Sequence, residues 1–262
     1  MANERKYNTL NPKQLHILTL LYKFRFATIP LLTHYKGLKT ETTLLRNLNL
    51  LQEQAYVDRH FDLSFKIDRK PAYYFLTKKG IAVFKDDSRF DPNVLHSYYK
   101  NKSLSEAFMQ HCADVLMAYN TLHQTYGDSF KIFTKPELAA FEDFPETKPD
   151  LFLRGENEYF MTLVHDQQLF ITKKRLAEYI EHSEEEGWEG GQYPGLLFVL
   201  SDSNAESRFL EHAKKTLESA GIDEDELRIG ATTIKAVRSK LYTSTIWTFV
   251  GANVVPSELT HI

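Results

Sequence analysis

Basic and acidic residues are divided unevenly along this chain of 262 residues. Residues 1–102 contain 18 Lys and Arg against 9 Asp and Glu, which leaves 14 against 26 in the remaining 160 residues. The net charge of −3 therefore conceals a front part of +9 and a back part of −12. Such asymmetry indicates two domains, and clustered Lys and Arg favour phosphate polymers through counterion release. We therefore expect the front part to bind nucleic acid.

The composition is that of a folded protein rather than a disordered one. Hydrophobic residues make up 42% of the chain, enough for one large core or two ordinary ones. Cys112, the single cysteine, excludes an intramolecular disulfide and a Cys-based zinc finger. The first residues lack an apolar signal region, and apolar runs such as 196–200 are far below the roughly 18 residues that span a bilayer. We expect a soluble, cytoplasmic protein.

The first fifty residues carry the periodicity of three helices. Leucines and a tyrosine recur at steps of three and four after Pro12, a residue suited to the first helical position, and predict a helix over 12–24. A short second helix is expected over 29–35. Gly37 suits the turn that follows, because glycine adopts positive φ at little cost. Thr40 is expected to cap the third helix.

The third helix is predicted to have one apolar and one polar face. The apolar positions are Leu44, Leu48, Leu51 and Ala55. The polar positions are Thr42, Thr43, Arg46, Asn47 and Asn49. Arg and Asn can make bidentate contacts with guanine and adenine in a major groove, and Thr can contact a phosphate or a thymine methyl. We predict that Arg46 and Asn47 lie at base edges, with Thr42 and Thr43 near phosphate; a merely solvated helix face is the alternative.

Two strands joined by a basic segment follow the third helix. Aromatic and β-branched residues at 56–59 and 73–76 predict a hairpin. The connection at 66–71 is rich in Lys and Arg, and we expect it to form a wing that contacts the DNA backbone. The cations of this wing are Lys66, Arg69 and Lys70.

The hairpin ends in the residues Tyr-Tyr-Phe-Leu-Thr-Lys-Lys-Gly at 73–80. The order helix, helix, turn, helix, hairpin, helix, closed by this segment, resembles the winged helix-turn-helix of the replication-relaxation family of bacterial plasmids and other mobile elements. The family has Leu-Thr-Pro-Lys-Gly where this chain has residues 76–80, with Lys78 in place of the proline. The resemblance covers about the first 85 residues and implies binding to double-stranded DNA.

The remainder of the chain predicts a second domain. We expect a winged helix-turn-helix over 1–88, a polar linker over 89–102 and a mixed α/β domain over 103–262. Apolar residues at helical spacing from Leu104 to Leu122 predict a long helix lying on a sheet. Strands are expected at 130–133, 150–153, 159–164, 196–200, 227–229 and 246–250, and helices at 173–182 and 205–219. Alternation of this kind is typical of α/β layers, and continuous apolar strands predict a sheet covered on both faces.

The order of these elements also resembles the core of PD-(D/E)xK nucleases, the second domain that the replication-relaxation resemblance implies. In active members, an Asp that begins one strand and a Glu-x-Lys on the next hold Mg²⁺. Here Asp150 supplies the first carboxylate, but Val164 stands at the Glu position, with Asp166 two residues further on. The resemblance therefore implies an inactive nuclease core, and we expect no enzymatic activity, no metal and no cofactor.

Together these patterns predict a sequence-specific double-stranded DNA-binding protein. The resemblance to the replication-relaxation family implies that it belongs to a mobile element and acts in control of replication or conjugative transfer, or in transcriptional regulation. The second domain is expected to form a homodimer or to recruit relaxosome, replication or transcription proteins, and no membrane partner is expected. Two alternatives stay open: a Mg²⁺-dependent nuclease of the PD-(D/E)xK type, and an adaptor whose winged helix docks proteins.

Overall fold

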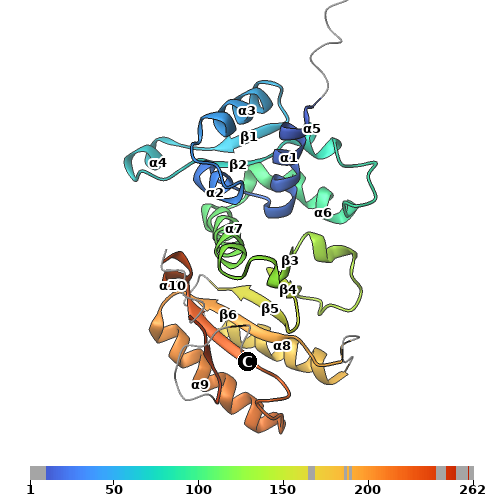
Figure 1. Cartoon of the computed structure of the whole chain (residues 1–262), viewed down its shortest axis with the longest axis vertical. Coiled ribbons are helices and arrows are strands. Elements are labelled where there is room, and N and C mark those ends of the chain that lie inside the picture. The colour runs from blue at the N-terminus through green and yellow to red at the C-terminus, as the bar shows by residue number, and fades with distance from the viewer. Residues whose placement is uncertain are drawn as a thin grey trace, which may run out of the picture. The chain divides into compact units, whose positions relative to one another are not determined.

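The computed structural model describes residues 10–164, 169–185, 188, 191–239, 246–251 and 259. The chain divides into two compact units, Met1–Leu116 and Met117–Ile262, which we call the first and the second unit (Figure 1). Helix α7 (Glu106–Tyr126) contains the boundary and contributes residues to both. Each unit is described by itself below.

The first unit combines helices with a small sheet. Its elements are α1 (Pro12–Phe24), α2 (Ile29–Tyr35), α3 (Thr42–Glu53), β1 (Val57–His60), α4 (Leu63–Ile67), β2 (Tyr73–Leu76), α5 (Lys78–Ala82), α6 (Pro92–Ser97), the 3-10 helix η2 (Tyr98–Ser103) and the start of α7. The expected bounds of the first two helices are confirmed. Helix α1 begins at Pro12 because Asn11 and Gln14 cap each other: each side-chain oxygen accepts the other residue's backbone N–H, at 3.1 and 2.9 Å.

The sheet of the first unit is built around β2. Strand β1 pairs antiparallel with β2, so that Val57 lies opposite Leu76 and His60 opposite Tyr73. The segment between α1 and α2 adds a third edge, because Ala27 exchanges two backbone hydrogen bonds with Tyr74, at 3.1 and 2.8 Å. All four β2 side chains are buried. The predicted hairpin strands are thus confirmed; β2 lies in the first unit's core, whereas in β1 only Val57 is fully buried.

Residues 89–102, expected to be a linker, are instead folded into the first unit. Tyr98 is 3% exposed, and its hydroxyl donates to the carbonyl of Tyr22 at 2.6 Å. Arg25 Nε donates to Asn101 Oδ1 at 2.9 Å. Polar residues of this segment, whose composition predicted a linker, therefore form hydrogen bonds with distant parts of the first unit.

The second unit is a mixed α/β structure, as expected. Its elements are the end of α7, η3 (Gly127–Ser129), β3 (Lys131–Thr134), η4 (Glu137–Ala140), β4 (Leu151–Arg154), β5 (Glu158–Leu163), α8 (Leu169–Glu185), β6 (Gly195–Leu200), α9 (Ser203–Ala220), β7 (Ile229–Thr233), α10 (Ile234–Arg238) and β8 (Thr248–Phe249). The strands form one sheet in the order β3-β4-β5-β6-β7-β8. The pairs β5-β6 and β6-β7 are parallel, and the other pairs are antiparallel.

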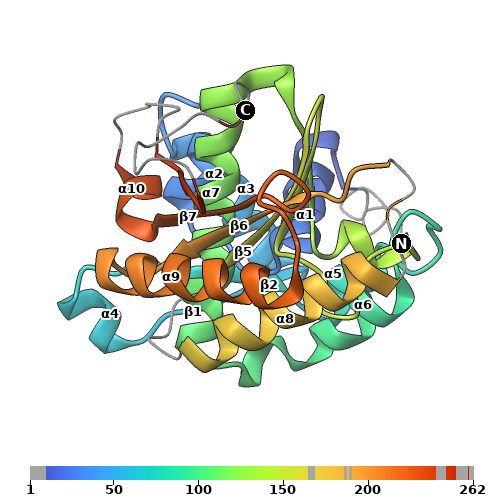
Figure 2. The ribbon, with the colours of Figure 1, turned by 90° about the horizontal axis from the view of Figure 1, so that it is seen from below.

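Helices cover both faces of the central strands. Helices α8 and α9 lie side by side along one face (Figure 2), where Phe198 and Leu200 join a core that includes Leu176 and Phe209. All six residues of β6 are buried. Because alternate side chains of a strand point to opposite faces, both faces of the sheet must be covered at β6. This confirms the prediction of a sheet covered on both sides. Within the described ranges, no helix is long and apolar enough to cross a membrane.

Candidate nucleic-acid interface

Helix α3 buries three of its five leucines, while Leu45 and Leu50 are exposed together with most of its polar side chains. The leucines of the inner face are at most 2% exposed: Leu44, Leu48 and Leu51. The predicted contact residues on the other side are Thr42, Thr43 and Arg46, which are exposed, and Asn47, which is half-buried. The four lie on successive turns because residues three and four apart share a helix face. This face is open to a ligand of the first unit.

Two details of α3 differ from the prediction. Thr40 lies outside the helix and is exposed, and the N-cap is Glu41, without a side-chain cap bond. Glu41 already has helical angles, φ −79° and ψ −13°, so the chain enters without the extended residue that a Thr cap requires. Ala55, expected on the apolar face, is exposed and follows the helix end with a φ of 59°. Its left-handed conformation reverses the chain into β1.

The hydrogen bonds within α3 determine which donors and acceptors of its polar face are available to a partner. Asn47 Nδ2 donates to the carbonyl of Thr43 at 2.8 Å, which occupies one amide hydrogen and leaves the second hydrogen and the oxygen available. Arg46 makes no hydrogen bond or ion pair with the described residues. Its five guanidinium N–H donors are therefore available to a partner.

The connection between β1 and β2 is not the extended wing that was expected. It contains the short helix α4, and we call residues 61–70 the basic tip. Asp62 Oδ1 accepts the backbone N–H of Phe65 at 3.3 Å, and the Phe65 ring is 1% exposed. A buried aromatic anchor and a capping carboxylate thus favour a helical turn here over a β-ribbon.

The cations of the basic tip differ in their surroundings. Lys66 and Arg69 are exposed, as predicted, and neither forms an ion pair within the described part of the chain. Lys70 Nζ lies 2.8 Å from Glu106 Oε1 and 3.6 Å from Asp68 Oδ2. The hydrogen bond with Glu106 raises the pKa of the Lys70 ammonium. Lys70 is therefore less available to a further anionic partner than Lys66 or Arg69.

The turn at Ala55 connects α3 to β1, and β1 leads directly into the basic tip (Figure 1). The predicted contact residues lie in two groups within the first unit, one at α3 and one in the basic tip. The α3 group is Thr40, Thr42, Thr43, Arg46 and Asn47, and the tip group is Lys66, Arg69 and Lys70.

Residues 76–80, which carried the family resemblance, hold the end of α3 in place. The Thr77 hydroxyl donates to the carbonyl of Ala55 at 2.6 Å, and its oxygen accepts the Gly80 N–H at 3.3 Å. Lys79 Nζ donates to the Gln54 carbonyl at 2.9 Å, where a cation also complements the helix dipole. A Cβ at Gly80 would come within 2.2 Å of the Tyr56 carbonyl oxygen. This positioning role was not predicted from the sequence, because the carbonyls that Thr77 and Lys79 contact lie 22 and 25 residues earlier in the chain.

In the second unit, Asp150 has a structural contact. It is 6% exposed, and its Oδ2 accepts the backbone N–H of Leu163 at 2.9 Å across the neighbouring strand. Asp166, which the resemblance to nucleases places two residues after the Glu position, lies outside the described residues. Among the residues that the structure describes, no group of three His, Cys, Asp or Glu side chains is placed to hold a metal.

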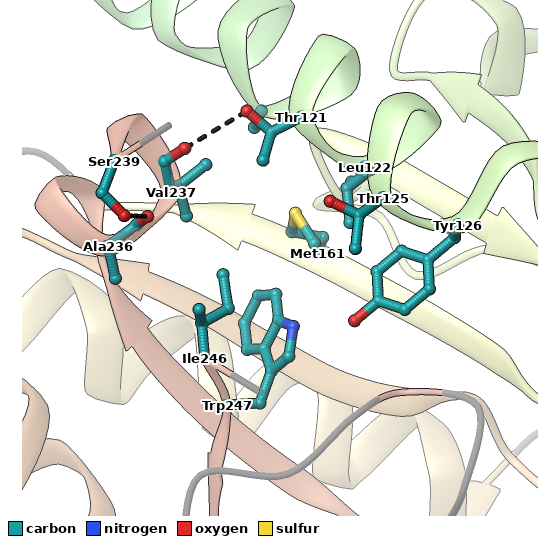
Figure 3. Close-up of a pocket in the computed structure, with 11 residues that line it drawn as sticks. Thr121, Leu122, Thr125, Tyr126, Met161, Ala236, Val237, Ser239, Ile246 and Trp247 are labelled. Atoms are coloured by element: carbon teal, nitrogen blue, oxygen red, sulfur yellow. Dashed lines mark hydrogen bonds between the residues drawn. The ribbon is translucent and has the colours of Figure 1, made fainter. Parts of the chain in front are cut away.

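A small cavity lies in the second unit between α7, β5 and α10 (Figure 3). Its volume of about 20 Å³ holds roughly one water molecule, far less than an organic substrate requires. Trp247 is fully buried at its wall, and its Nε1 has no hydrogen-bond partner among the described residues. Figure 3 shows the indole facing Thr125 and Tyr126 across this space.

Two comparisons with known sequences find no match. No protein-family model matches the chain, and no curated protein sequence matches it.

Proposed function

We propose that this protein binds double-stranded DNA in a sequence-specific manner through its first unit. Helix α3 enters the major groove with Arg46 and Asn47 at base edges, and Thr42 and Thr43 contact phosphates. Thr40 lies close to the helix start, where it can reach the same phosphates. The observation that carries the proposal is the exposed, unpaired Arg46 on the face of α3 opposite three buried leucines.

The basic tip gives the proposal its second contact. Lys66 and Arg69 meet the DNA backbone beside the groove that α3 occupies, and Lys70 joins them when it releases Glu106. These contacts position the protein without reading sequence, since phosphates are the same at every base pair. The order of helices, turn and hairpin supports a winged helix-turn-helix in which the basic tip takes the place of the wing.

In the second unit, the order α7, β3, β4, β5, α8, β6 supports kinship with the PD-(D/E)xK core. We propose that the unit acts without catalysis, as a homodimerisation or recruitment domain, because the Asp150 carboxylate is used as an acceptor for backbone N–H. By resemblance to the replication-relaxation family, the whole protein would work in replication, conjugative transfer or transcription on a mobile element.

Selection of duplexes from a random pool by the whole chain, followed by equilibrium binding at several salt concentrations, tests the proposal. The selected duplex should bind more tightly than a scrambled one. Lys66→Ala should weaken both and reduce the slope of log K against log salt by about 1. Arg89→Ala removes an exposed arginine that is paired with Asp87 and serves as the control, with no change in slope. A pool that yields no preferred sequence would refute sequence-specific binding.

A further inference from the structure

The basic tip presents an apolar side chain to solvent. Ile67 is 81% exposed, the highest value among the large apolar side chains that the structure describes. Phe61, at the start of the tip, is 45% exposed. The Ile67 side chain is therefore largely unburied within the first unit and is open to contact with a partner.

The structure fixes Ile67 in this outward position. Phe65 and Ile67 are two residues apart in α4, and residues at that spacing face opposite sides of a helix. Phe65 is anchored edge-to-face on Tyr73, with ring centroids 5.9 Å apart, and its carbonyl accepts the N–H of Lys70 at 2.8 Å. Burial of Phe65 therefore directs Ile67 away from the unit.

Charged residues flank the exposed side chain. Lys66 precedes Ile67 and Asp68 follows it, with the Asp68 carboxylate 3.6 Å from Lys70 Nζ. Arg69 comes next with a φ of 53°, which ends the helix in a left-handed turn. The side chains of Lys66 and Arg69 are exposed. A neutral apolar partner would give these cations no counter-charge. A duplex offers both chemistries: phosphates along the groove edge for the cations, and stacked bases between which an aliphatic wedge can enter.

We infer that Ile67 is a wedge that enters the minor groove beside the site contacted by α3 and bends the duplex. The inference rests on the proposed DNA-binding function and adds the deformation of the DNA to it. Lys66 and Arg69 hold the backbone on either side while Ile67 separates two base pairs. Because unstacking is easiest at pyrimidine–purine steps, the wedge favours such a step without reading a base edge.

The test uses the whole chain and the selected duplex, labelled at both ends for energy transfer. The wild-type protein should introduce a kink in the range of about 20–90°. Ile67→Ala should reduce the bend angle by at least about half and weaken binding about tenfold, with the salt slope unchanged because no charge is removed. Phe170→Ala, at a residue of the second unit that is 75% exposed, is the matched control and should behave as wild type.

The outcomes separate the two proposals. If the wild type selects and binds a duplex but Ile67→Ala bends it as the wild type does, the wedge is wrong and the DNA-binding function stands. If the wild type binds no duplex, both fail. If Ile67→Ala leaves bending intact but changes the sedimentation of the free protein, the tip contacts a second copy of the chain, and the wedge is likewise overturned.

Discussion

Arg25 joins three distant parts of the first unit, and removing its guanidinium tests whether residues 89–102 belong to that unit. It caps the end of α1 with a φ of 64° and donates to Asn101 Oδ1 and to the Ser97 carbonyl, both at 2.9 Å. The guanidinium carbon also lies 4.8 Å from the ring centroid of Tyr98 and 5.0 Å from that of Phe108. Arg25→Met keeps an apolar stem on these rings and deletes the charge and the donors.

The expected loss of stability follows from these contacts. Asn101 is 2% exposed, and an unsatisfied buried acceptor costs about 1–3 kcal/mol. Each lost cation–π contact adds about 0.5–1 kcal/mol. The retained stem offsets part of this, which leaves about 2–4 kcal/mol. With a urea dependence of about 2 kcal/mol per molar, the midpoint of the first unit's unfolding should fall by about 1–2 M.

Two optical probes assign this loss to one unit. The chain has two tryptophans, Trp188 and Trp247, and both lie in the second unit. Urea titration of Arg25→Met should therefore shift the early part of the far-UV circular dichroism transition and leave the tryptophan fluorescence transition in place. Arg89→Met removes an exposed arginine and should change neither. If Arg25→Met unfolds at the wild-type midpoint by both probes, residues 89–102 are a linker after all, and the reasoning is refuted.

Three further predictions concern single positions. Gly80→Ala should lower the melting temperature of the circular dichroism transition and weaken DNA binding, because the new Cβ meets the Tyr56 carbonyl oxygen; a wild-type melting curve would contradict this. Burial, and next the charge of Lys36, lower the pKa of His16 from 6.5, so the His16 imidazole binds a proton more readily in the unfolded chain than in the folded one. The free energy of unfolding should therefore fall as pH drops from about 7 to 5, and it should fall less steeply in His16→Gln. Because Trp247 Nε1 is buried without a hydrogen-bond partner among the described residues, a high-resolution crystal structure should show an ordered water that accepts its N–H in the small cavity. A dry cavity would contradict this prediction.

Local patterns were sufficient for the elements whose signals lie close together in the sequence. Helix α1 has its cap, its proline and its apolar repeat within thirteen residues, and its bounds were predicted without error. Strand β6 is a continuous apolar run, and its burial on both sides followed from that run alone. The exposed face of α3 could be predicted for the same reason, since a helix with three inward leucines has only one direction left for Arg46.

Where the predictions from the sequence were wrong, contacts between distant residues determine the structure. The basic tip is helical because Phe65 packs in a cluster with Tyr73 and Met109, the latter 44 positions further along the chain. The supposed linker is ordered because Tyr98 reaches Tyr22. Lys70 and Glu106, which form an ion pair, are 36 residues apart in the sequence. This pair lowers the contribution that we expect from Lys70 to the proposed DNA binding. No window of adjacent residues contains these partners.

Base preference of the Arg46→Ala variant is the measurement that tests the central claim most directly. Affinities for every single-base-pair variant of the selected duplex would be compared between this protein and the wild type. If α3 reads the major groove, the variant should lose discrimination of about 1–3 kcal/mol at one base pair, most simply a G·C pair, and keep the wild-type preferences elsewhere. If the preferences at all base pairs stay unchanged, or all binding weakens uniformly, Arg46 reads no base, and the proposed orientation of α3 on DNA is wrong.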